Sequence, residues 1–116
     1  MEKITIRMSE SAPVSIDPEQ WPVIAEARDH DGQQYECQAN TLRTIRVRRK
    51  SAAEYLVYGY AKAGAGGQFA GTRNPYAGYR VADLDAGVGA IRRVAGVLGD
   101  DHLGSECIAD LPAMEI

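Results

Sequence analysis

Polar and apolar residues alternate in two consecutive runs between residues 42 and 62. In the first run Ile45 and Val47 are separated by a single polar residue, and in the second run Tyr55 and Val57 are spaced in the same way. A period of two in β-branched and aromatic residues is typical of half-buried strands. The pattern therefore predicts two antiparallel strands joined by a basic turn.

The pairing of these two strands decides which side chains share a face. A loop over 49–53 would place Arg48 opposite Glu54 and Val47 opposite Tyr55, so that one face is wholly apolar. The other face would carry basic and large side chains: Arg46, Arg48, Leu56, Tyr58 and Tyr60. Arginine and tyrosine are enriched in protein interfaces, so this face is a candidate contact surface. The sequence leaves open the alternative that a second layer covers the tyrosines while the arginines are solvated.

The N-terminal part of the chain predicts one further strand and a connection. Residues 4–8 alternate between apolar and polar side chains and predict a short strand. The polar segment 9–20 contains two prolines and predicts an irregular connection, with room for one turn of helix after Asp17. Trp21 then opens the next strand.

Residues 23–39 predict a hairpin that turns at His30-Asp31-Gly32, with the glycine in the left-handed position. In that register Glu26 faces Glu36, an unfavourable pair of like charges. We therefore expect one of these glutamates to meet an arginine on a neighbouring strand. The apolar parity changes before Ile45, which predicts a β-bulge near Arg43.

The segment 63–79 is rich in glycine and predicts the longest irregular connection of the chain. Its side chains suited to recognition are Arg73, Asn74 and Tyr76. The loop lacks the Gly-Lys-Ser/Thr ending of a phosphate-binding loop, so the pattern does not favour nucleotide binding.

Beyond this loop the period changes from two to that of a helix. The apolar stripe comprises Leu84, Val88, Ile91, Ala95 and Leu98. Asp83 is a suitable N-cap and Gly99 a suitable C-terminal stop, so a helix is predicted over 84–98. The segment 106–111 predicts a last strand. These patterns together predict a single α+β domain over 1–116: an antiparallel β-meander of five or six strands with one α-helix packed across one face.

Charge is unevenly distributed along the chain. The net charge of −3 gives no overall preference for nucleic acid. Residues 43–50 nevertheless carry five basic groups, whereas residues 100–116 carry five acidic groups and no Lys or Arg. The basic cluster is suited to an acidic partner, to phosphates, or to pairing with the acidic C-terminal segment.

The sequence contains no recognisable catalytic or metal-binding constellation. Cys37 and Cys107 fit no metal-ligand spacing and are interpreted as small buried hydrophobic residues. His30 and His102 are each explained by a turn or a helix exit. We therefore expect a non-enzymatic protein with no cofactor and no metal. The absence of a signal-peptide pattern and of a long apolar run predicts a cytoplasmic protein without a membrane span.

Four phrases are familiar in combination: WPVIAEARDHDG at 21–32, IRVRR at 45–49, YLVYG at 55–59 and ECIADLPAMEI at 106–116. Together they resemble small uncharacterised proteins of Mu-like transposable bacteriophages and related mobile elements. The resemblance covers most of the chain, but its motifs are strands and turns. It implies a phage or prophage origin and action in a bacterial cytoplasm, and it implies no activity.

Two functional hypotheses follow. The first is a non-enzymatic interaction protein that occupies a surface of a host protein, such as an inhibitor of a bacterial defence system of the anti-CRISPR kind. The second is a small nucleic-acid-binding or regulatory module that uses the basic segment Arg43–Lys50, with tyrosines stacking on bases. The predicted partner-binding residues are Arg46, Arg48, Arg49, Lys50, Leu56, Tyr58, Tyr60 and Arg73. The sequence leaves a homodimer open.

Overall fold

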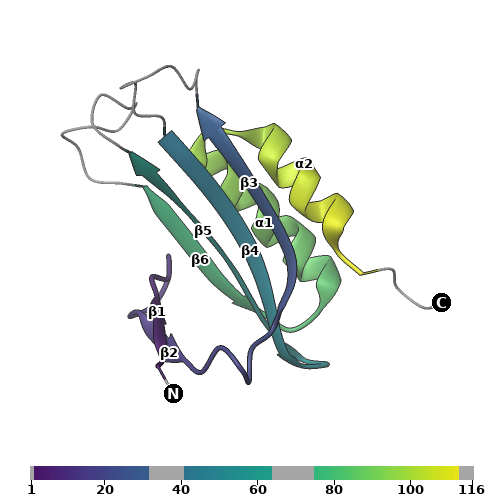
Figure 1. The fold of residues 1–116 in the computed structure, drawn as a ribbon. Coiled ribbons are helices and arrows are strands. Elements are labelled where there is room, and N and C mark those ends of the chain that lie inside the picture. Colours follow the sequence, from purple (N-terminus) through teal and green to yellow (C-terminus); the bar gives the residue numbers. More distant parts are fainter. Residues whose placement is uncertain (1, 32–40, 64–74, 113–116) are drawn as a thin grey trace.

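The computed structural model describes residues 2–31, 41–63 and 75–112. Its elements, in chain order, are β1 (Ile4–Ile6), β2 (Val14–Ile16), β3 (Val23–Asp31), β4 (Thr41–Ser51), β5 (Glu54–Ala63), β6 (Tyr76–Val81), α1 (Leu84–Leu98) and α2 (Asp101–Asp110). Strands β3 to β6 form one antiparallel sheet in sequence order, and β1 and β2 form a separate antiparallel pair. Figure 1 shows both helices on one face of the four-stranded sheet. The predicted α+β class and antiparallel meander are confirmed.

The main core lies between the sheet and the two helices. Its centre is formed by Ile45, Val47 and Val57 from the sheet and by Ile91 and Leu98 from α1, all of which are almost completely buried. The alternation of the strands and the helical stripe of α1 therefore meet as the sequence predicts. The longest helix of the chain is stabilised by this packing as much as by its own propensity.

The predicted ends of α1 are also confirmed. The Asp83 carboxylate accepts a hydrogen bond from the Ala86 N–H at 2.7 Å, which satisfies one unpaired donor of the first turn. Gly99 follows the last turn with a φ of 74°, a left-handed conformation that costs glycine little.

The predicted C-terminal strand over 106–111 is wrong, because most of this segment belongs to the second helix, α2. Asp100 caps this helix by accepting a hydrogen bond from the Leu103 N–H at 3.1 Å. Leu103 and Cys107 lie four residues apart on one helical face, and both are fully buried in the main core. The aspartates after Gly99 therefore begin a helix.

The predicted hairpin over 23–39 is also wrong. Strand β3 continues to Asp31 and pairs with β4, so that Ala25 lies opposite Val47 and Ala27 opposite Ile45. The proposed turn at His30 is part of this ladder, and residues 32–40 lie outside the described chain.

No bulge occurs near Arg43, where the ladders to β3 and to β5 are continuous. Arg43 lies on the same face as Ile45, and its Nε donates a hydrogen bond to the Leu98 carbonyl at 2.9 Å. A buried arginine on the helix-facing side therefore accounts for the apparent change of parity. The irregularities of register lie elsewhere, between Val23 and Ala25 and near the end of β4.

The predicted pairing of β4 with β5 has the correct faces but is shifted by two residues. Val47 lies opposite Val57, and Arg48 opposite Leu56, because β4 continues to Ser51 and the turn is shorter than predicted. A shift by two residues leaves every side chain on its predicted face.

Two predicted connections contain strands. The segment 9–20 includes β2, and a hydrogen-bonded turn follows Asp17, where the Trp21 N–H donates to the Asp17 carbonyl at 3.2 Å. Strand β6 begins within the segment 63–79. Residues 64–74 of that segment lie outside the described part of the chain. None of the described helices is both long and apolar enough to cross a membrane.

Candidate functional site

The face of the four-stranded sheet opposite the helices is called the outer face here, and the N-terminal segment covers part of it. A second hydrophobic cluster is formed there by Ile6, Met8, Ile16, Trp21, Leu56 and Tyr58. The segment is fastened to β6, since the Ser9 N–H donates to the Gly78 carbonyl at 2.9 Å. The approach is so close that a Cβ at Gly78 would lie 2.5 Å from the Arg7 carbonyl oxygen. The sequence leaves open whether the tyrosines are exposed or covered by a second layer. The structure shows that Tyr58 is covered.

Arg48 is a buried structural arginine. Its Nε donates to the Tyr58 hydroxyl and its Nη1 to the Trp21 carbonyl, each at 2.9 Å, and the residue is 9% exposed. These bonds connect the chain before β3 to β4 and β5. Arg48, Leu56 and Tyr58 were predicted to bind a partner, but the structure places all three in its interior.

Arg46 lies on the same face of β4 as Arg48, two residues earlier in the chain. It is only partly covered. Its Nε forms an ion pair with the Glu26 carboxylate, and its Nη1 lies 3.5 Å from the Tyr60 hydroxyl. Burial alone would lower the pKa of the guanidinium. The hydrogen bond to Glu26 and the nearby Tyr60 and Tyr58 outweigh this effect and raise the pKa of Arg46 above its ordinary value. Arg46 is therefore a permanent cation whose charge Glu26 compensates.

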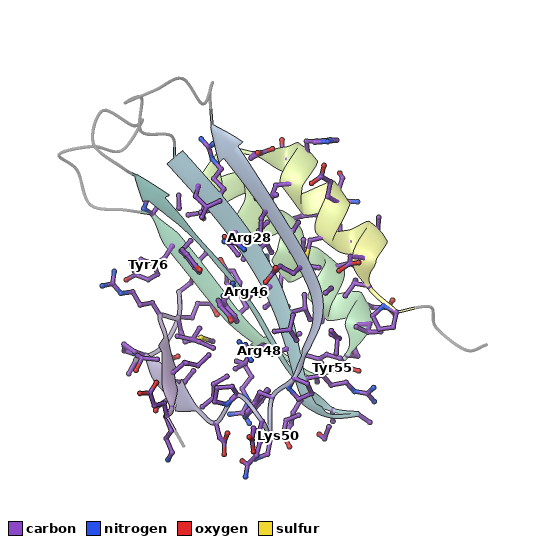
Figure 2. All side chains as sticks on the ribbon, viewed as in Figure 1. Arg28, Arg46, Arg48, Lys50, Tyr55 and Tyr76 are labelled. Atoms are coloured by element: carbon purple, nitrogen blue, oxygen red, sulfur yellow. The ribbon has the colours of Figure 1, made fainter. Side chains whose placement is uncertain are left out.

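Two of the predicted partner-binding residues, Arg49 and Lys50, lie beside the turn between β4 and β5. The guanidinium of Arg49 lies 5.6 Å from the centre of the Tyr55 ring, and the ammonium of Lys50 lies 5.9 Å from the centre of the Trp21 ring. Both basic residues are exposed. Figure 2 shows Lys50 at the end of the sheet remote from Tyr76. The predicted residue Arg73 lies outside the described chain.

A groove of about 480 Å³ lies between β1 and the outer face of the sheet. It is lined by Ile4, Thr5, Ile6, Arg7, Arg46, Tyr58, Gly59, Tyr60, Ala61, Pro75 and Tyr76. Its volume falls within the range of ligand-binding clefts in proteins. The walls combine apolar side chains with tyrosines and two arginines, which is the composition that favours binding of a partner. Of the predicted residues, the lining thus brings together Arg46 and Tyr60, both partly exposed, with Tyr58, of which only 6% is exposed.

Arg7 and Tyr76 form the outer edge of this groove. The guanidinium carbon of Arg7 lies 5.2 Å from the centre of the Tyr76 ring, within the range of cation–π attraction. The contact joins Arg7, the residue after β1, to the start of β6. Figure 2 shows Tyr76 projecting beside β6. Arg7 was not among the residues that the sequence predicted, whereas Tyr76 was recognised as a candidate.

The groove was missed because the segment 9–20 was interpreted as a connection. Val14 and Ile16 flank a single polar residue, which is the same alternation that identified the strand at residues 4–8. This pattern could have predicted the β1–β2 pair. The pattern itself contains no signal for the face of the sheet on which that pair would lie.

Other chemistry-bearing groups stand apart from the groove. His102 is exposed and its Nε2 lies 3.0 Å from Glu106, four residues further along α2. The thiol of Cys107 is buried, and burial, with smaller contributions from Asp110 and Glu26, raises its pKa to about 12. Such a thiol is protonated at neutral pH and a poor nucleophile. Within residues 2–31, 41–63 and 75–112 no group of three or more metal-ligating side chains occurs.

Comparison with known proteins places the chain in no family: no family model, no curated protein and no solved structure matches it.

Proposed function

We propose that this chain is a non-enzymatic protein of a bacteriophage or related mobile element, and that it acts in the bacterial cytoplasm by binding a protein target. The observation that carries the proposal is the groove beside β1, whose lining combines tyrosines and arginines with apolar side chains. Tyrosine and arginine are the side chains that most often dominate binding energy at protein interfaces. The groove replaces the flat Arg and Tyr face of the sequence prediction as the contact surface.

The finer proposal is that the target belongs to a bacterial defence system, such as CRISPR interference, which the chain inhibits by occupying a surface. Its support is the resemblance to proteins of Mu-like phages, together with a contact surface that needs no chemistry of its own. An inhibitor of this kind requires affinity and a rigid surface, and it requires no catalytic group.

The competing function, a nucleic-acid-binding module, is less well supported by the geometry. It needs tyrosines free to stack on bases and four basic residues on phosphates: Arg46, Arg48, Arg49 and Lys50. Arg48 instead bonds to Tyr58 and to the Trp21 carbonyl, and Arg46 is paired with Glu26. Of the basic strand and turn, Arg49 and Lys50 remain as exposed cations.

A steric block of the groove tests the proposal without relying on its charge. Thr5 is exposed and lines the groove, whereas Ser15, which lies opposite it on β2, is also exposed but is not part of the lining. Thr5→Trp should abolish capture of a target from bacterial host lysate, and Ser15→Trp should retain it. Both variants should keep the melting temperature of the parent protein, because each changes an exposed position.

The same pair of variants tests the finer proposal in cells. Expression of the parent chain should restore plating of a phage that the host defence otherwise blocks, and Thr5→Trp should remove this effect while Ser15→Trp retains it. Capture that survives Thr5→Trp would refute the groove as the contact surface. Binding that instead tracks a nucleic acid, with a steep dependence on salt, would favour the competing function.

A further inference from the structure

The groove beside β1 has an unbalanced charge. Among the described residues of its lining two are cationic, Arg7 and Arg46, and none is acidic. Glu26 compensates Arg46 from the neighbouring strand. Among the described residues Arg7 has no carboxylate partner, and its guanidinium contacts the Tyr76 ring instead. The described part of the lining therefore carries one uncompensated positive charge, at Arg7.

The position of Arg7 is suited to a carboxylate. A guanidinium that stacks on an aromatic ring uses one of its flat faces, and the N–H groups around its edge remain available for a planar acceptor. The side chain is exposed, so a ligand can reach it without opening the fold. The ring of Tyr76 restricts the motion of the guanidinium, which reduces the entropy lost when a ligand binds.

The remainder of the lining is suited to an apolar side chain. This part of the lining comes from three places: Ile4 and Ile6 of β1, Tyr60 of β5, and Pro75, the residue before β6. These side chains would bury a hydrophobic or aromatic group placed next to the carboxylate. A ligand with several negative charges would find one uncompensated cation only, and the others would be desolvated without a partner.

We propose that the groove binds a peptide segment of a protein partner in which one carboxylate lies beside an apolar or aromatic side chain, with the carboxylate on Arg7. That the occupant is a protein rests on the proposed function. The single charge and the apolar neighbour follow from the lining itself. The segment binds in an extended form along β1, since consecutive residues from Ile4 to Arg7 line the groove.

The test uses two blocked tetrapeptides, Gly-Phe-Glu-Gly and Gly-Phe-Gln-Gly, titrated into the nitrogen-15-labelled full chain and followed by NMR. The glutamate peptide should shift the amide signals of Thr5, Arg7 and Tyr60. Its affinity should exceed that of the glutamine peptide about tenfold, the value of one charge-assisted hydrogen-bonded contact. Arg7→Gln should remove this preference, whereas Arg49→Gln, which deletes an equal charge at the β4–β5 turn, should leave it intact.

Three results with the peptides alone would overturn the inference. They are equal affinity for the two peptides, shifts centred on the β4–β5 turn, and no shift in the groove at peptide concentrations on the order of 10 mM. An oligothymidylate that displaced the glutamate peptide from the groove with a steep salt dependence would also overturn it, because the preferred ligand would then be a phosphate backbone.

Failure of this inference and failure of the proposed function give different results. If Thr5→Trp abolishes capture of a host protein but the peptides show no charge preference, the function stands and the ligand chemistry is wrong. If the glutamate peptide binds through Arg7 but no host protein depends on the groove, the ligand chemistry stands and the function is wrong.

Discussion

Glu26 and Arg46 lie directly opposite each other on β3 and β4, and their side chains form an ion pair on the outer face of the sheet. The sequence predicted that either Glu26 or Glu36 would meet an arginine on a neighbouring strand, and this is confirmed for Glu26. The backbone N–H of Glu26 also donates to the Asp110 carboxylate at 3.0 Å. One residue thus ties β3 to β4 by its side chain and to the end of α2 by its backbone.

This ion pair should contribute measurably to stability. Its two side chains are 24% and 35% exposed, so water screens the attraction only in part. A double-mutant cycle with Glu26→Gln and Arg46→Gln should give a coupling free energy of about 1 kcal/mol in urea unfolding, the upper end for pairs near the surface.

The pair Glu54–Arg80 provides a matched control in the same sheet. Its atoms approach to 3.2 Å, but the arginine side chain is 64% exposed. The same cycle on this pair should give a coupling of about 0.3 kcal/mol that salt reduces further. Equal couplings for the two pairs would show that the partial cover over Arg46 has no energetic effect.

Two neighbouring arginines of β4 should respond very differently to charge reversal. Arg48→Glu places a carboxylate among the buried Tyr58 hydroxyl and the Trp21 carbonyl, and should cost about 3 kcal/mol or more in the free energy of unfolding. Arg49→Glu changes an exposed side chain and should cost about 0.5 kcal/mol or less. Chemical denaturation of both variants is the measurement, and similar losses would contradict the buried position of Arg48.

Two glycine-to-alanine substitutions in the helices should have opposite signs. A Cβ at Gly104 of α2 would lie 2.7 Å from the Ala95 Cβ of α1, so alanine would force the two helices apart. We expect Gly104→Ala to destabilise the fold by about 1–3 kcal/mol. A Cβ at Gly89 meets nothing within 4 Å, so Gly89→Ala should stabilise α1 by roughly 0.5–1 kcal/mol. Melting temperatures that move in the same direction would contradict the close approach of α1 and α2.

The sequence predicted the faces of the sheet better than its registers. Alternation along β4 and β5 places Arg46 and Tyr58 on the outer face in both the predicted and the observed register, because the two registers differ by two residues and such a shift preserves the parity. The length of that turn is decided by the local conformation at Ala52 and Ala53, where no glycine, proline or asparagine signals a turn type. The register of this pair therefore could not be read from the pattern alone.

The candidate site was predictable only in part, for a reason of tertiary packing. Tyr60 and Arg46 share a face that the alternation reveals, but whether this face is free depends on a strand pair at least thirty residues away in sequence. The prediction of a strand over 106–111 was wrong for a different reason. A short apolar run such as that at Cys107 and Ile108 is compatible with both strand and helix, and the buried contact of Leu103 decides for the helix.

The buried thiol of Cys107 should make the fold sensitive to alkaline pH. Burial, followed by the carboxylates of Asp110 and Glu26, raises its pKa to about 12, whereas an unfolded cysteine titrates near its ordinary pKa of 9.0. Between these two values the unfolded chain releases a proton that the folded chain retains, so stability is complete below pH 9 and falls as the pH rises. In a Cys37→Ser background, the free energy of unfolding should fall by about 1 kcal/mol more between pH 7 and pH 10 than it does after Cys107→Ala as well. Urea unfolding at the two pH values measures this difference. Identical losses with and without the Cys107 thiol would show that it titrates alike in the folded and unfolded chain, and that the space around it in the core admits water.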